Sequence, residues 1–251
     1  MLSIKNADLT FNPNTNIEKR LFNKLNLHFN ERDFVTVIGA NGSGKSSLLN
    51  MISGNYILEA GTVFLKNKDI SKDPEWKRAK YIGRVFQSPV LGLAPDMTLV
   101  ENFAIMLHKN KKHIFSKGIT KNEKKIIYNE LKSLNVNLED KLSNKPSELS
   151  GGQCQSAALL MAVLANPLIL LLDEHTAALD PQSARKVLSL TERLIKDRKL
   201  TAIMVTHNIN NALQYGNRLI MIKDGVPILD VAGEEKEKIS AEEVITMFGE
   251  I

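Results

Sequence analysis

The 251-residue sequence has few of the features that mark secreted or membrane-spanning proteins. Its single cysteine, Cys154, cannot form an internal disulfide, which excludes a disulfide-stapled secreted domain. No apolar segment follows a basic start at the N-terminus, so we expect no signal peptide. The most apolar stretch, residues 157–172, is interrupted by Asn166 and Pro167 and is too short to cross a bilayer. We therefore expect a soluble, cytoplasmic chain.

Internal repeats, heptad runs and cysteine or histidine spacings typical of metal sites are also absent from the sequence. A content of 43% hydrophobic and 24% charged residues is ordinary for a globular protein and excludes a disordered or fibrous chain. The net charge is +5 and the isoelectric point about 9.1. An excess of positive charge is compatible with binding to nucleic acid, with binding to an acidic membrane surface or with no special partner. The distribution of the basic residues along the chain is therefore more informative than the net charge.

Short apolar runs alternate with helical patterns, which predicts an α/β fold. The runs at 168–172, 201–205 and 218–222 are almost wholly apolar, as in parallel strands that are buried on both faces. Residues 97–165 are mostly helical in pattern and predict an insert in the α/β core. The remaining predicted elements are a strand at 34–38, a helix from Lys45, a strand at 62–67, a hairpin turn at 223–225, and a helix at 240–248 capped by Ser240 and Glu243.

Residues 39–46 read GANGSGKS and fit the phosphate-loop pattern G-x-x-x-x-G-K-S. They stand between a predicted strand and a predicted helix, where backbone N–H groups and a helix N-terminus face an anion. Lys45 would reach the β- and γ-phosphates, and the Ser46 hydroxyl would bind Mg²⁺. The alternative is a chance glycine-rich turn, which the flanking strand and helix disfavour.

A carboxylate pair, Asp173 and Glu174, ends the apolar run at 168–172. Asp173 suits Mg²⁺, and Glu174 suits the orientation or deprotonation of an attacking water. By itself the pair could be a solvated strand end. Together with a phosphate loop it predicts a nucleotide-hydrolysing site at the carboxyl edge of the sheet.

Residues 149–153 read LSGGQ and lie 105 positions after Lys45, counted to Ser150. Taken alone, Ser150 could be a plain helix N-cap. The order of phosphate loop, LSGGQ and carboxylate pair resembles the ATP-binding cassette (ABC) ATPases over nearly the whole chain. The resemblance implies the ABC form of the P-loop NTPase fold: a RecA-like core and an antiparallel β subdomain in 1–87 and 166–251, with an inserted helical subdomain at 88–165.

The resemblance also assigns roles residue by residue. Gln87 matches the glutamine loop, Asp180 the D-loop, His207 the switch histidine, and Phe11 the aromatic residue that stacks on adenine. Without this context, Phe11 could equally be a core aromatic in a strand. Gln87 alone is more typical of polar surface, and His207 alone is more typical of a loop histidine with its hydrogen bonds satisfied. The implied catalytic residues are Glu174, His207, Gln87 and Lys45, and the implied Mg²⁺ ligands are Ser46, Gln87 and Asp173. The implied ATP contacts are Phe11, Gly39, Asn41, Gly42, Ser43, Gly44, Lys45, Ser46, Ser47, Ser150, Gly151, Gly152, Gln153 and Asp180.

Two positions depart from the family pattern. His175 stands where proline is usual, and Cys154 stands where arginine or glutamine usually follows LSGGQ. Neither change removes a catalytic group. The DEHTAALDP run, with the segments around LTFNP and HNINNALQYGNRLIMIKDG, resembles a bacterial uptake group assigned to tryptophan or related amino acids.

In this family, the LSGGQ loop of one cassette closes on ATP held by the phosphate loop of another. One set of motifs therefore implies a head-to-tail homodimer with ATP at the interface. The resemblance also implies a separate membrane permease, docked on the helical insert and on residues 88–102. It further implies a solute-binding protein for import and a place on the cytoplasmic face of the plasma membrane.

Other functions remain compatible with the sequence. The nearest is an ABC exporter or lipoprotein-release system. A DNA- or ribosome-directed ABC ATPase is disfavoured, because the spacing between the phosphate loop and LSGGQ leaves no room for a long coiled coil and only one cassette is present. We expect no nucleic-acid partner. A phosphate-loop module without turnover is disfavoured by Glu174 and His207.

The basic charge is concentrated at residues 108–125, which hold seven lysines and one glutamate. The rest of the chain is close to neutral, so the isoelectric point does not indicate a nucleic-acid-binding face. This stretch is either a solvated loop or a segment that faces anionic lipid when the cassette is docked.

Overall fold

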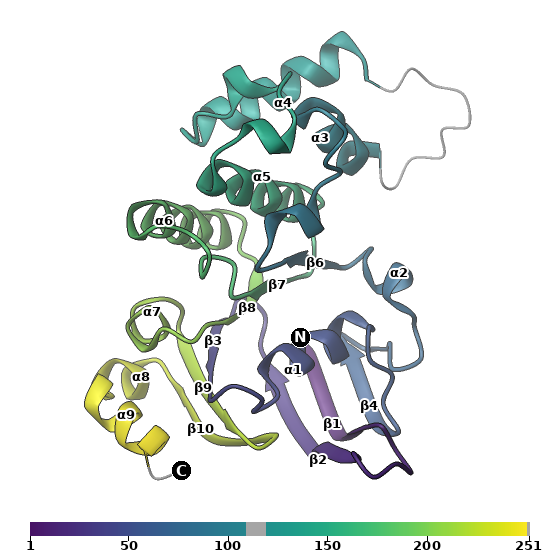
Figure 1. Ribbon diagram of the computed structural model, residues 1–251, viewed down its shortest axis with the longest axis vertical. Helices are drawn as coiled ribbons and strands as arrows, with labels where there is room; N and C mark the ends of the chain where they lie inside the picture. The colour runs from purple at the N-terminus through teal and green to yellow at the C-terminus, as the bar shows by residue number, and fades with distance from the viewer. Residues whose placement is uncertain (109–118, 250–251) are drawn as a thin grey trace.

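The structure, a computed structural model, describes residues 1–108 and 119–249 (Figure 1). Most of the lysine-rich stretch, residues 109–118, lies outside the described residues. Its described lysines, at positions 121, 124 and 125, belong to helix α4. Within the described residues, no helix has both the length and the apolar character needed to cross a bilayer.

Two sheets build the lower part of the molecule in Figure 1. The six-stranded sheet has the order β10-β9-β3-β8-β7-β6; all neighbours are parallel except β10, which forms an antiparallel hairpin with β9. The four-stranded antiparallel sheet has the order β2-β1-β4-β5. The strands are β1 (Leu2–Phe11), β2 (Lys19–Phe29), β3 (Phe34–Ile38), β4 (Ala60–Leu65), β5 (Lys68–Asp69), β6 (Ile82–Val85), β7 (Ile169–Asp173), β8 (Thr201–Val205), β9 (Arg218–Lys223) and β10 (Val226–Ala232).

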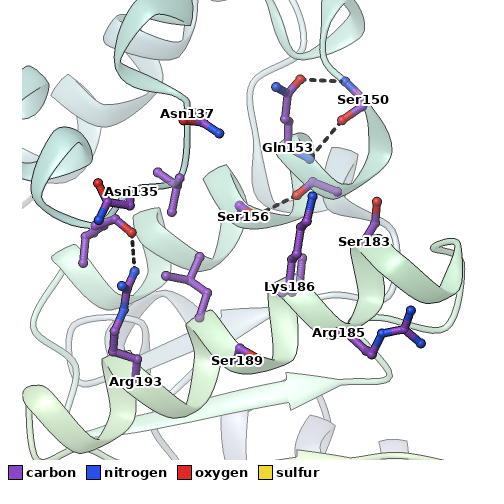
Figure 2. A pocket seen from close by; sticks show the side chains of 15 residues that line it. Asn135, Asn137, Ser150, Gln153, Ser156, Ser183, Arg185, Lys186, Ser189 and Arg193 are labelled. Atoms are coloured by element: carbon purple, nitrogen blue, oxygen red, sulfur yellow. Dashed lines mark hydrogen bonds between the residues drawn. The ribbon is translucent and has the colours of Figure 1, made fainter.

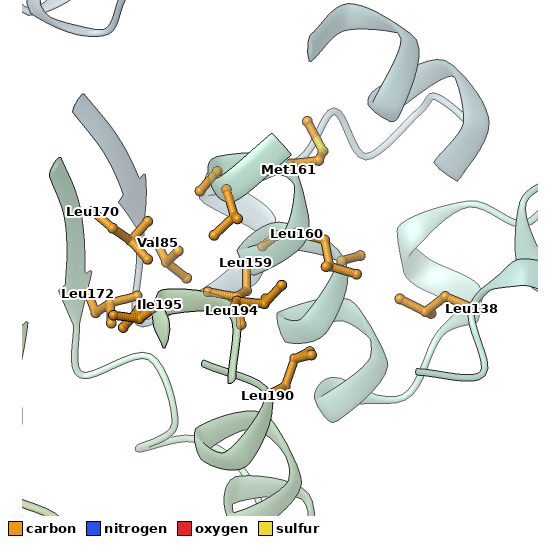
Figure 3. Packing of buried hydrophobic residues seen from close by; sticks show 14 of the residues in the cluster. Val85, Leu138, Leu159, Leu160, Met161, Leu170, Leu172, Leu190, Leu194 and Ile195 are labelled. Atoms are coloured by element: carbon orange, nitrogen blue, oxygen red, sulfur yellow. The ribbon is translucent and has the colours of Figure 1, made fainter. Parts of the chain in front are cut away.

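The central strands are buried on both faces, which confirms the prediction from their continuous apolar runs. In β7, Leu170 and Leu172 belong to one core cluster, whereas Ile169 and Leu171 belong to the other. This alternation follows from the two-residue period of a strand. One cluster fills the space between the two sheets and α1. The second lies under the helices on the opposite face, where α5 and α6 pack on the strands (Figure 3).

The helices fall on both sides of the six-stranded sheet. Between residues 97 and 165, the described chain contains α-helices and 3₁₀ turns and no strand, which confirms the helical pattern predicted there. The α-helices are α1 (Lys45–Ser53), α2 (Glu75–Arg78), α3 (Leu99–His108), α4 (Lys121–Ser133), α5 (Gly151–Leu164), α6 (Pro181–Asp197), α7 (Ile209–Gln214), α8 (Glu234–Lys238) and α9 (Ala241–Gly249). The 3₁₀ turns are Pro89–Gly92, Glu139–Lys141 and Pro146–Glu148. Helices α3, α4 and α5 gather at the end of the molecule remote from the four-stranded sheet (Figure 1).

Local signals located several elements correctly. Asp224 and Gly225 both have positive φ and form the tight turn between β9 and β10. Ser240 and Glu243 make the reciprocal capping bonds that begin α9. The bounds predicted for one strand were wrong by two residues at each end: the strand predicted at 62–67 is β4, Ala60–Leu65. It ends at Leu65 because Lys66 takes a left-handed conformation that turns the chain into β5.

Candidate functional site

Four neighbouring strands bring the predicted catalytic residues to one edge of the sheet. Strands β3, β8, β7 and β6 are parallel neighbours, so their carboxyl ends meet at the same edge. The phosphate loop follows β3, and His207 follows β8 closely. Asp173 ends β7, with Glu174 directly after it. Gln87 follows β6 on an exposed segment.

The phosphate loop needs glycine for two reasons. Gly39 has φ +154°, and a Cβ there would stand 2.1 Å from the carbonyl oxygen of Ile222. Gly44 has φ +109° and begins α1 without a side-chain cap, so the first N–H groups of α1 have no side-chain acceptor. The Ser43 hydroxyl is buried and has no hydrogen-bond partner within the described chain. Free donors at a helix N-terminus fit a phosphate group.

Lys45 is buried at the start of α1. Its Nζ donates to the carbonyl oxygens of Gly39 and Ala40 at 2.8 and 2.9 Å. Burial lowers the pKa of Lys45, while Glu174 and Asp173 act in the opposite direction. The ammonium group is therefore held in the loop by backbone oxygens, which phosphate oxygens can replace.

Two side-chain pairs join the strand ends. Ser46 Oγ donates to Asp173 Oδ1 at 3.0 Å, and His207 Nδ1 lies 3.2 Å from Glu174 Oε2. The backbone N–H of Glu174 donates to the carbonyl of Val205 at the end of β8, which holds the main chain of Glu174 at the junction of the two strands. No hydrogen bond joins Gln87 to these groups in residues 1–108 and 119–249. This edge of the sheet thus carries two neighbouring pairs: the Ser46 hydroxyl with the Asp173 carboxylate, and the His207 imidazole with the Glu174 carboxylate.

A cavity of about 280 Å³ adjoins these groups. Among the predicted nucleotide contacts, seven line it: Phe11, Asn41, Gly42, Gly44, Lys45, Ser46 and Ser47. Lys19, Leu21 and Glu174 complete the lining. The Phe11 ring, which lines the cavity, meets Tyr56 edge-on, with 5.3 Å between ring centroids. No sequence motif had singled out Lys19, Leu21 or Tyr56.

Three of the LSGGQ residues, Ser150, Gly152 and Gln153, line a different pocket, of about 680 Å³, between α5, α6 and the turn at 134–137 (Figure 2). Ser150 caps α5: its Oγ accepts from the N–H of Gln153 at 3.4 Å, and Gln153 Oε1 accepts from the N–H of Ser150. A Cβ on Gly152 would stand 2.9 Å from that of Ser183, so glycine lets α5 and α6 approach closely. Within one chain, the signature residues and the phosphate loop line separate pockets.

Asp180 caps α6, the helix beside this pocket. Its Oδ1 accepts from the N–H groups of Gln182 and Ser183, both at 3.0 Å. Hydrogen bonds from Ser183, first its side chain and then its backbone, hold the pKa of Asp180 below its usual range. Deeper in the same helix pair, buried Gln155 of α5 donates to the carbonyl of Phe86 at 3.1 Å, directly before Gln87.

Comparison with known proteins shows the family of the chain. The sequence profile of a family described as ABC transporter matches residues 22–177. The chain belongs to the ABC transporter family. The resemblance found in the sequence is therefore confirmed, and with it the ABC ATPase fold and an ATP-binding, ATP-hydrolysing cassette.

Individual relatives of this ABC cassette extend over nearly its whole length. It is 41% identical over 253 residues to a tyrosine transport ATP-binding protein of Clostridioides difficile, covering 99% of this chain and 98% of that protein. It is 29% identical to a methionine import ATP-binding protein of Streptococcus pyogenes, covering 99% of this chain and 71% of that protein. A dimeric cassette solved in a post-hydrolysis state with ADP and phosphate is similar at a TM-score of 0.76 and 30% identity, over 92% of this chain and 98% of that one.

His175, the departure next to Glu174, is buried and anchors the turn after β7 to α6. The Thr191 hydroxyl donates to the carbonyl of Val187 at 2.8 Å, so His175 Nε2, 3.1 Å away, carries the proton between the two side chains. Burial lowers the pKa of His175 to about 4. The imidazole is therefore neutral in the folded ABC cassette at neutral pH.

This buried histidine predicts acid sensitivity. Below pH ~6.5 the unfolded chain binds a proton at His175, whereas the folded chain resists it until about pH 4, so stability is lost as pH falls through this window. The full loss is roughly 3 kcal/mol. Urea unfolding at pH 7.0 and 4.5 should show a flatter pH dependence for His175→Gln than for wild type. The exposed-histidine variant His28→Gln should match wild type, and equal slopes for all three proteins would contradict the prediction.

Proposed function

We propose that this chain hydrolyses ATP to energise import of an amino acid or similar small solute through a separate membrane permease. The observation that carries the proposal is the meeting of the Ser46–Asp173 and Glu174–His207 pairs beside the phosphate loop, at 3.0 and 3.2 Å. The name of the 41% identical relative, a tyrosine transport protein, supports an amino acid as solute. In this function the chain acts at the cytoplasmic face of the plasma membrane.

In the proposed mechanism, Lys45 exchanges its two carbonyl acceptors for phosphate oxygens, and the N-terminus of α1 binds the same anion. Ser46 and Asp173 supply hard oxygen donors of the kind Mg²⁺ prefers, and Gln87 would join them from the segment after β6. Bound Mg²⁺ would neutralise charge on the phosphates. Glu174 orients a water and accepts its proton as the water attacks the γ-phosphorus, while His207 holds the Glu174 carboxylate and contacts the γ-phosphate.

A second copy of this chain completes each site in the proposal. The pocket that holds Ser150, Gly152 and Gln153 opens beside α6 and contains no phosphate loop of its own. In a head-to-tail dimer, Ser150, Gly151, Gly152 and Gln153 would meet ATP bound by the partner copy, with Asp180 beside the same interface. The 3.4 Å bond of the Ser150 hydroxyl is long enough to be exchanged for a phosphate oxygen.

The permease would dock on the segment after Gln87. Val90, Leu91 and Met97 in this segment are large apolar side chains that remain exposed, Leu91 at 69%. Exposed apolar side chains that lie together are typical of protein interfaces. Residues 88–165 would form the helical subdomain that carries this surface, and a solute-binding protein would deliver the solute to the permease.

Reconstitution tests the direction and the solute. The chain is combined in proteoliposomes with the permease and binding protein encoded beside its gene, and ATP hydrolysis and uptake are measured with L-tyrosine, L-tryptophan or L-methionine. One of these amino acids should raise ATP hydrolysis several-fold and accumulate on the side of the membrane where the cassette acts. Glu174→Gln serves as the inactive control. Extrusion of solute or lipoprotein toward the other side would contradict import and favour the exporter alternative.

A further inference from the structure

Arg84 is a charged residue in β6, in contact with the carboxylate assigned to Mg²⁺. Its Nη2 lies 3.2 Å from Asp173 Oδ2, and the two side chains are only 12% and 15% exposed. Asp173 Oδ1 accepts from Ser46. Both oxygens of this carboxylate therefore have a partner before any ligand binds.

The guanidinium of Arg84 is held from several sides. It lies over the Phe86 ring at 4.6 Å from the centroid, and its Nη1 donates to Ser53 Oγ at 3.3 Å. The Cα of Arg84 is held in place by the sheet, because Arg84 pairs with Leu171 of β7 in the parallel register. A planar cation fixed in this way retains its place beside Asp173 with little further loss of side-chain freedom.

Charge balance at this edge bears on metal binding. Asp173 and Glu174 contribute two negative charges, which Lys45 and Arg84 offset. In the part of the chain that the structure describes, no group of three acidic, histidine or cysteine side chains is placed to hold a metal ion. A divalent cation at Ser46 and Asp173 would therefore meet a site without net negative charge and with few ligands.

We propose that Arg84 makes divalent-metal binding depend on nucleotide, by neutralising Asp173 until phosphate oxygens supply the missing charge and ligands. The inference rests on the proposed function in one respect, that the metal accompanies ATP at Ser46 and Asp173. Arg84 is a positioning residue in this role, because it acts through the Asp173 carboxylate. Removing its charge strengthens metal binding to the protein without nucleotide, an effect that loss of structure cannot produce.

Mn²⁺ binding to the nucleotide-free protein tests this role without any hydrolysis. Mn²⁺ replaces Mg²⁺ as a probe, and the concentration of unbound Mn²⁺ is measured from its electron paramagnetic resonance signal. Arg84→Met and Arg84→Gln should each bind Mn²⁺ about tenfold more tightly than wild type, since a unit charge close to the ion has been removed. Arg84→Lys retains the charge and should bind nearly as weakly as wild type. With ADP present, the Mn²⁺ affinities of the two neutral variants and of wild type should differ much less.

Two controls locate the effect. Arg32→Met removes an exposed arginine before β3, at the end of that strand remote from the phosphate loop, and should leave Mn²⁺ binding unchanged. Adding Asp173→Asn to Arg84→Met should abolish the gained affinity. Unchanged Mn²⁺ binding in both neutral variants, or an Arg84→Lys variant that behaves like them, would overturn the proposal. Failure of the proposed function would appear separately, as absent ATP hydrolysis in the wild-type protein.

Discussion

Glu174→Gln should retain ATP binding and lose nearly all ATP hydrolysis. The carboxylate stands at the end of β7, 21% exposed, with its backbone fixed to β8 and one oxygen beside His207. Glutamine preserves the size of the side chain and its contact with His207, but an amide does not accept a proton from water. Loss of a general base typically lowers the rate by about 10²–10⁴-fold.

The same variant should also form a dimer that ATP stabilises. In the proposed cycle, the γ-phosphate bridges the two copies until hydrolysis removes it, so a non-hydrolysing variant remains closed. Phosphate release, binding of a fluorescent ATP analogue and size-exclusion chromatography with ATP measure the three properties. Glu234→Gln, which changes an exposed glutamate on α8, is the matched control and should behave as wild type. Unchanged hydrolysis in Glu174→Gln would refute the role of Glu174.

Arg78→Met should destabilise the fold strongly. Arg78 is 2% exposed and donates to four backbone carbonyls, those of Met51, Ile52, Ser71 and Asp73. Two of these carbonyls lie at the carboxyl end of α1, where a cation is favoured by the helix dipole. Gly54 makes the approach possible, because a Cβ there would stand 2.8 Å from Arg78 Nε.

Methionine fills part of the same space but removes the guanidinium donors from all four carbonyls, of which that of Met51 keeps a bond from the N–H of Gly54. The free energy of unfolding should fall by at least about 3 kcal/mol, since buried unpaired polar groups cost about 1–3 kcal/mol each. For a chain of this length, the melting temperature should fall by roughly 6–12 °C. Arg78→Lys should be intermediate, because one ammonium group cannot span all four carbonyls. Arg32→Met is the exposed control, and a melting temperature for Arg78→Met equal to that of this control would contradict the prediction.

The sequence predicts the candidate site most directly where the chemistry is carried by adjacent residues. The phosphate loop, the carboxylate pair and the LSGGQ helix start are each carried by a few adjacent residues, and each stands where the flanking apolar pattern predicts a strand end or a helix start. The central strands were equally clear, because burial on both faces leaves an uninterrupted apolar run.

The antiparallel sheet was harder to locate from individual residues. Positive φ at Asn6 and Lys24 marks irregularities where the pairing of β1 and β2 shifts, so the apolar alternation is broken within each strand. Only the family resemblance indicated a β subdomain there. Longer-range contacts were missed altogether: Arg84 meets Asp173 across 89 positions, and its one local signal is a charge within the otherwise buried strand β6.

The hydrogen bond from Gln155 to Phe86 links two ATP sites in the proposed dimer. Gln155 belongs to the helix that would meet the partner's nucleotide, and Phe86 precedes the glutamine that would meet the chain's own. Moving one without the other breaks this hydrogen bond and leaves the buried Gln155 amide without its acceptor, at a cost of about 1–3 kcal/mol. A permease that displaces the Gln87 segment would therefore alter both composite sites at once. The two ATP sites would then be coupled through the side-chain amide of Gln155.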